Sequence, residues 1–285
     1  MNDELKLLDL QHIGEGRYAA PMPAGSQEGR DVIFGGQLIA QMIMASKLNA
    51  SDAKYVKSIH TVFSRAGAYG QPLELQVEPF HDGRTWGTSI ITAWQGERLL
   101  SKSMVLSTAD ETDLISHEIA PPMGVKGPQF GTPVTATQFP GAEVLEAETE
   151  FDTSHGVPAM SLWMRMPAPV GSIAASQAVL AWSTNGWIIG LAMREHGEQV
   201  RIGDAHHTLS TGVIGHTIHF HREFDAGSWM HISQEATYAG RGRVHGQGAV
   251  FSEDGRLLAT FAQDSMLKAV DVKVVGSVPD HNARL

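Results

Sequence analysis

The sequence contains no cysteine, which excludes disulfide bonds and thiolate chemistry and fits a reducing compartment. It also lacks an apolar run long enough to cross a bilayer, because Asn185 and Arg194 interrupt the best candidate. The segment MNDELKLLDL at the N-terminus is too acidic, and its apolar run too short, for a signal peptide. These absences predict a cytoplasmic protein that does not insert into a membrane.

Basic residues are scarce as well. The 285 residues include 21 Lys and Arg against 31 Asp and Glu, which gives a formal net charge of -10. Because nucleic-acid binding normally requires a basic patch, nucleic acid is not an expected partner. Hydrophobic residues make up 42% of the chain, enough for the core of one large domain or two small ones.

Two apolar segments show helical spacing. The first covers residues 34–47, where a Gly-Gly pair opens the run, and the second covers residues 172–193. Both are apolar on most of their surface, so both are predicted to be buried helices. Segments rich in β-branched and aromatic residues follow each helix and predict strands. The predicted strands are residues 55–65, 73–80, 85–94 and 98–107, and then 212–224, 229–239, 243–252 and 256–267.

The two halves repeat one another. Phe63-Ser64-Arg65 recurs as Phe220-His221-Arg222, and the turn glycines Gly96 and Gly255 occupy corresponding places. One buried helix followed by antiparallel strands, twice, predicts a duplicated α+β unit in which a sheet wraps a helix. Two unrelated α+β domains are the alternative. We predict a first domain at residues 1–110, a linker rich in Pro and Gly at 111–155, and a second domain at 156–285.

Several motifs, in order and in both halves, resemble those of the acyl-CoA thioesterase II family. They are VIFGGQLIAQ at 32–41, HTVFSR at 60–65, HDGRTW at 81–86, GHTIHFHREF at 215–224 and LATFAQDSML at 258–267. The resemblance implies a double hotdog, meaning two fused helix-and-sheet units. It also implies a homo-oligomer that hydrolyses fatty acyl-CoA without a metal or another cofactor.

The resemblance further implies a water molecule held by an Asp, a Thr or Ser, and a Gln. In this sequence the three positions fall on Asn185, Val213 and Gln263, so that only the glutamine is kept. Asparagine cannot take a proton at neutral pH, and valine forms no hydrogen bond through its side chain. Met104 is matched with Gln263 in the first half, so no second site is expected there.

By the same resemblance, substrate binding is expected at Gly35, Gly36, His60 and His216. The Gly-Gly pair can open a helix whose N–H groups polarise a carbonyl, although close packing of the helix on the sheet is an equal alternative.

Zinc is the one metal that the histidines suggest. His219 and His221 share one face of a strand and could chelate zinc. However, His216 and His221 match histidines that the family has without metal, and no metal site is predicted.

The departures from the family pattern leave alternatives open. Asn185 is either part of a site or a buried amide satisfied by Gln263 or Ser183. Asp204 and Asp264 are candidate replacement bases, although strand alternation points Asp264 away from Gln263. The leading function is acyl-CoA hydrolysis, and a non-catalytic acyl-CoA-binding protein is the alternative. Hydration of an enoyl thioester is a weaker third hypothesis, because it needs an Asp-His pair.

Overall fold

The computed structural model describes residues 3–22, 31–51, 53–135, 138–150, 156–194, 196 and 208–270. In these ranges the helices are α1 (Gly35–Asn49), α2 (Ile173–Ser183) and α3 (Trp187–Arg194), with short 3-10 helices η1 (Asp3–Leu8) and η2 (Pro128–Phe130). The strands are β1 (Gln11–Gly14), β2 (Arg17–Ala20), β3 (Tyr55–Phe63), β4 (Leu73–Asp82), β5 (Trp86–Gln95), β6 (Arg98–Thr108), β7 (Thr132–Pro133), β8 (Glu143–Glu146), β9 (Ala159–Arg165), β10 (Leu209–Phe220), β11 (Met230–Gly240), β12 (Arg243–Ser252) and β13 (Leu257–Ala269).

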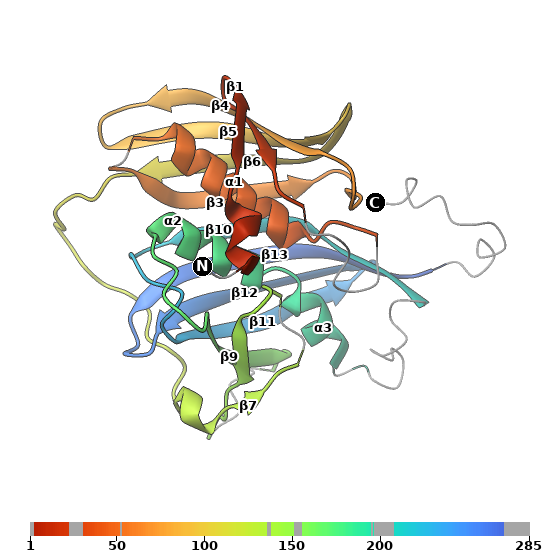
Figure 1. The fold of residues 1–285 in the computed structure, drawn as a ribbon. Coiled ribbons are helices and arrows are strands. Elements are labelled where there is room, and N and C mark those ends of the chain that lie inside the picture. The colour runs from red at the N-terminus through yellow and green to blue at the C-terminus, as the bar shows by residue number, and fades with distance from the viewer. Residues whose placement is uncertain are drawn as a thin grey trace.

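The described strands form one antiparallel sheet, in the order β1-β2-β4-β5-β6-β3-β10-β13-β12-β11-β9-β8-β7. Strands β3 to β6 of the first half, orange to yellow in Figure 1, lie beside strands β10 to β13 of the second half, cyan to blue, and α1 and α2 lie next to each other on the same face. The halves meet where β3 pairs with β10. The predicted α+β double hotdog is therefore confirmed.

Matching irregularities show that the halves are copies. The ladder between β3 and β6 shifts register after Val56, and the ladder between β10 and β13 shifts after Val213. Because these bulges occupy the same place in each half, they give a structural reference for comparing the two.

The bulges correct the match between Met104 and Gln263. Three residues beyond the bulge valines lie Ile59 and His216, which pair with Val105 and Gln263 respectively. The first-half equivalent of Gln263 is therefore the buried Val105, whereas Met104 is 59% exposed on the other face of the sheet. A slip of one residue moves a side chain to the opposite face, which is why a sequence match alone misplaced it.

The predicted helix at 172–193 is two helices. α2 ends at Ser183 and α3 begins at Trp187, and residues 184–186 form a turn between them. Gly186 has φ +104°, a conformation that glycine adopts at little cost and that ends the helical path. The prediction of one continuous helix was wrong, because the apolar run masked this break.

α1 and α2 pack closely at the start of α1. A Cβ placed on Gly36 would lie 2.6 Å from the carbonyl oxygen of Trp182, so only glycine fits there without a shift. Gly36 therefore allows close packing of α1 on α2, where the alternative had predicted packing of the helix on the sheet.

Part of the predicted linker belongs to the sheet. β8 pairs with β9, and β7 pairs with β8, so both extend one edge of the second half. The Trp163 indole also donates a hydrogen bond to the carbonyl of Lys126, at 2.8 Å. The predicted domain limits remain predictions. No helix in the described ranges is long and apolar enough to span a membrane.

Candidate active site

Asn185 lies in the turn between α2 and α3 and is fully buried. Neither its Oδ1 nor its Nδ2 has a hydrogen-bond partner among the described residues. Its neighbours are satisfied locally, since the Ser183 hydroxyl donates to the Val179 carbonyl and the Thr184 hydroxyl to the Ala181 carbonyl. The alternative that Asn185 is a satisfied core amide therefore does not hold.

Gln263 is held beside Asn185 by hydrogen bonds at both ends of its amide. The backbone N–H of Gly186 donates to Gln263 Oε1 at 2.8 Å, and Gln263 Nε2 donates to Ser265 Oγ at 2.9 Å. Gln263 and Ser265 are both fully buried. The retained glutamine is thus tied to the peptide that follows Asn185.

The N-terminal end of α1 also lies next to the Asn185 side chain. A Cβ on Gly35 would lie 3.3 Å from Asn185 Oδ1, so the α1 backbone runs next to this side chain. Phe34, the N-cap residue, gives no side-chain hydrogen bond to the first turn. An uncapped helix start carries unsatisfied N–H groups and the positive end of the helix dipole. The N-terminal end of α1, from the first half, therefore lies beside the Asn185 amide of the second half.

His216 pairs directly with Gln263 across β10 and β13, so both side chains lie on the inner face. Its Nε2 lies 3.3 Å from the Thr184 hydroxyl oxygen, and its Nδ1 has no partner among the described residues. Burial lowers the pKa of His216 to about 4, so the ring is neutral at pH 7. A neutral imidazole with a free nitrogen can accept a proton.

Of the remaining predicted residues, the structure brings Val213 to the site but not His60. Val213 is paired with Ser265, which places it on the same face as Gln263. His60 is different, because it is exposed and its Nδ1 lies 2.6 Å from the Thr217 hydroxyl. Thr217 follows His216 in β10 and points to the outer face, so the sheet separates His60 from Gln263.

The candidate replacement bases do not join the site. Asp264 lies on the outer face, where its carboxylate is 2.9 Å from His245 Nδ1, as strand alternation predicts. This is the Asp-His pair that an enoyl hydratase would need, but the sheet separates it from Asn185 and Gln263. Asp204 lies outside the described residues. Within the described ranges, no group of three or more His, Asp or Glu side chains is placed to hold a metal.

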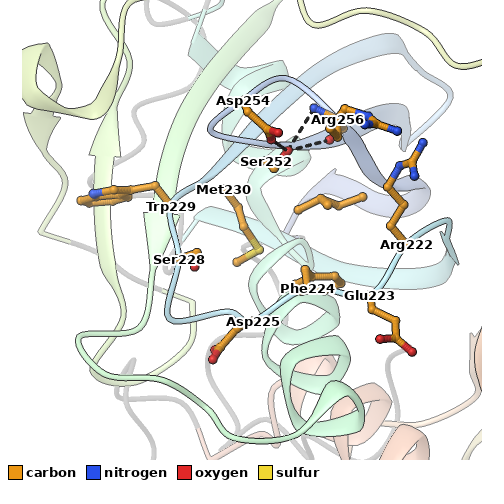
Figure 2. Close-up of a pocket in the computed structure, with 11 residues that line it drawn as sticks. Arg222, Glu223, Phe224, Asp225, Ser228, Trp229, Met230, Ser252, Asp254 and Arg256 are labelled. Carbon is orange, nitrogen blue, oxygen red and sulfur yellow. Dashed lines mark hydrogen bonds between the residues drawn. The ribbon is translucent and has the colours of Figure 1, made fainter.

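A surface pocket of about 320 Å³ lies elsewhere, where β10 ends and β12 turns into β13. Figure 2 shows Arg222 and Arg256 on one side of it, and none of the predicted site residues lines it. Glu118 accepts hydrogen bonds from both arginines, at 2.9 and 2.8 Å, and the Arg222 bond is the main cause of its lowered pKa. The arginines are thus paired with a carboxylate from the segment between the halves.

Ser265 is the site residue that the sequence reasoning missed. A usable signal was present, because residues two apart on a strand share a face, and Gln263 was already assigned. Its bond to Gln263 Nε2 depends on a side-chain conformation that spacing does not give.

Solved structures of similar shape support the hotdog assignment. An acyl-CoA thioesterase II from Mycobacterium marinum aligns with a TM-score of 0.77 at 21% identity, covering 94% of this chain and 98% of that one. A hot dog fold protein of unknown function from Alicyclobacillus acidocaldarius aligns with a TM-score of 0.75 at 18% identity, covering 95% and 100%. At sequence identities this low, the similarity to these structures establishes the fold of the chain and nothing more.

Family membership follows from the sequence models of two domains. The acyl-CoA thioesterase N-terminal domain matches residues 23–110, and the acyl-CoA thioesterase C-terminal domain matches residues 117–267. The chain therefore belongs to the acyl-CoA thioesterase II family.

Relatives from bacteria and animals are similar over most of their length. Acyl-CoA thioesterase 2 of Haemophilus influenzae is 24% identical, with 94% of this chain and 98% of the relative covered. Acyl-coenzyme A thioesterase 8 of Homo sapiens is 26% identical, with 83% and 80% covered.

Proposed function

We propose that this protein hydrolyses the thioester of an acyl-CoA to a free acid and CoA, at the site formed by Asn185, Gln263 and the start of α1. The observation that carries the proposal is the buried Asn185 amide with both polar atoms unpaired beside Gly35. Leaving a buried polar group unpaired costs about 1–3 kcal/mol. A ligand or a water molecule that completes these bonds explains why such a group is kept.

The geometry supports a division of labour in the hydrolysis. The first-turn N–H groups of α1, at Gly35 and Gly36, can stabilise the negative charge that develops on the thioester oxygen. Asn185 Oδ1 and the second N–H of Gln263 Nε2 can hold a water molecule beside the carbonyl carbon. Water attacks that carbon, the tetrahedral intermediate collapses, and the CoA sulfur leaves as a thiolate that is then protonated.

His216 is our candidate for the group that receives the proton of the attacking water. It stands next to Gln263, and its Nδ1 has no partner among the described residues. Its pKa of about 4 is close to the ordinary value of about 3.9 for an aspartate. The neutral ring thus offers an unpaired nitrogen that can accept a proton, even though Asn185 replaces the family's Asp.

A second function, acyl-CoA binding without turnover, is favoured by one specific observation. Asn185 and Val213 each lack the group on which the family's water activation depends. Neither change prevents a carbonyl or a water molecule from binding at the site.

Thiol release from short to long acyl-CoAs separates the two functions. We expect turnover by the wild type and a fall of about 10²-fold in kcat for Gln263→Ala, the size typical of losing one positioned hydrogen-bond donor. His216→Asn should lower kcat by a similar factor, in the range typical of general-base catalysis. Saturable acyl-CoA binding without thiol release at any chain length would establish the binder instead.

The wild-type assays need a control for conversion of Asn185 to aspartate. Asn185 precedes Gly186 outside both helices, in a sequence that favours spontaneous conversion of the amide to the acid. Intact-mass measurement of the wild type should therefore accompany each assay. Activity that grows on storage together with the mass of the acid form would show that a carboxylate, and not Asn185, catalyses the reaction.

We also propose that the protein forms a homo-oligomer through the outer face of its sheet. Val62 on β3 is 47% exposed and Met104 on β6 is 59% exposed, and both point away from the helices. Light scattering gives the mass in solution. Met104→Lys should lower that mass, while a monomeric wild type would refute the proposal.

A further inference from the structure

Three groups form a directed chain of hydrogen bonds in the site. The backbone N–H of Gly186 can only donate, so the atom of Gln263 that it contacts must be the amide oxygen. The other end of the amide, Nε2, therefore faces Ser265, and Ser265 Oγ acts as the acceptor at 2.9 Å. Among the described residues, none accepts the hydroxyl hydrogen of Ser265, which can therefore still donate.

Ser265 stands across from Val213. The two residues are paired in the ladder between β10 and β13, and they share a face with Gln263. Ser265 is fully buried, so its hydroxyl cannot be satisfied by bulk water. The hydroxyl that Val213 lacks is thus present on the neighbouring strand, at the residue paired with it.

We propose that Ser265 is a positioning residue for hydrolysis, which orients Gln263 from β13 and supplies a buried hydroxyl opposite Val213, which has none. The inference rests on the proposed thioesterase activity. Ser265 acts through Gln263, because its oxygen holds one N–H of the amide and so directs the other N–H toward the attacking water.

The first half contains a matched reference for this residue. Ser107 is paired with Val56 at the equivalent bulge, just as Ser265 is paired with Val213. Two residues earlier on its strand stands Val105, where the second half has Gln263. Ser107 lies 3.5 Å from the Ser46 hydroxyl and has no amide at that position to orient. The first half therefore carries a serine at the equivalent position that has no glutamine to orient.

Steady-state kinetics of four variants test the proposal. Ser265→Ala should lower kcat by about tenfold or more with little change in KM, because one hydrogen bond that positions Gln263 is lost. Ser107→Ala should keep kcat within about twofold of the wild type. Adding Val213→Thr to Ser265→Ala should recover most of the lost kcat, since the hydroxyl returns on the opposite strand. Ser265→Thr, which keeps the hydroxyl on β13, should stay near the wild type.

Each other outcome is decisive. A Ser265→Ala enzyme with wild-type kcat overturns the proposal, and so does an equal loss in Ser107→Ala. Failure of both Ser265→Thr and the Val213→Thr double variant to keep activity, while thermal unfolding matches the wild type, would reduce Ser265 to a packing role. A wild type without turnover on any acyl-CoA refutes the proposed function itself, and this inference falls with it.

Discussion

Asn185 lies in the protein interior, and neither polar atom of its amide has a hydrogen-bond partner in the part of the chain that the structure describes. The adjacent polar side chains Ser183 and Thr184 bond to the carbonyls of their own helix. The contrast indicates that burial alone does not explain Asn185, because its neighbours show how a polar residue is normally satisfied in this turn. An apolar substitution of Asn185 should therefore raise the stability of the protein and lower its activity.

Replacing Asn185 with leucine should separate the two. The change keeps a branched side chain and removes unpaired polar atoms, so the free energy of unfolding should rise by about 1 kcal/mol or more, while acyl-CoA turnover falls. Urea unfolding measures the first effect and thiol release the second.

Thr184→Val is the matched control, since its hydroxyl is bonded to the Ala181 carbonyl. This variant should lose stability. A less stable Asn185→Leu protein would show that the amide has partners after all.

Residue types and family motifs predicted Asn185, Val213, Gln263 and His216 for one site, and the structure brings them together. The same reasoning placed His60 with them, although the sheet lies between. A motif gives the residue but not the face of the strand. Ser265 escaped because its role depends on the orientation of the Gln263 amide, which the Gly186 N–H sets only in the folded chain.

At the scale of secondary structure, the turn at residues 184–186 creates the site. It ends α2 next to the start of α1, and it frees the N–H of Gly186 to bond with Gln263. A continuous helix would instead commit that N–H to a carbonyl four residues earlier. The positive φ of Gly186 is what makes the turn possible.

Gly186→Ala should therefore destabilise the protein by about 1 kcal/mol or more, because φ near +104° is unfavourable for alanine. Gly190→Ala is the control: it lies inside α3, and an added Cβ would meet nothing within 4 Å. That change should raise stability by up to about 1 kcal/mol. Thermal unfolding of the pair checks the prediction, and equal effects would contradict it.

Periodicity predicted the core elements well, since every strand predicted after the two helices is present. The strands toward the two ends of the sheet, β1, β2, β7, β8 and β9, were missed. β1, β2, β7 and β8 have only two to four residues, and β9 is buried along most of its length and so shows no alternation. Pairing register was also beyond the sequence, as the shift from Met104 to Val105 illustrates.

For the molecule as a whole, buried histidines couple folding to pH. Burial lowers the pKa of both His216 and His231 to about 4, and the His231 ring packs between Trp163 and Phe251. In the unfolded chain a histidine has a pKa of about 6.5. Between these values the unfolded state binds more protons, so stability is fully present above about pH 6.5 and is lost as the pH falls toward 4.

The free energy of unfolding in urea should accordingly be lower at pH 5 than at pH 7.5, by roughly 4 kcal/mol for the two histidines together. His231→Phe, which keeps an aromatic ring between Trp163 and Phe251, should remove about half of that difference. Identical stability of the wild type at the two pH values would contradict this account.

The joining of β3 to β10 within one chain has an evolutionary consequence. Where two identical subunits pair, each mutation appears in both copies. Here a mutation alters one half alone, so the first half can carry Val105 where the second keeps Gln263. Fusion therefore allows each half to specialise. The first half contributes the N-terminal end of α1 to the site, and the second half contributes the polar side chains.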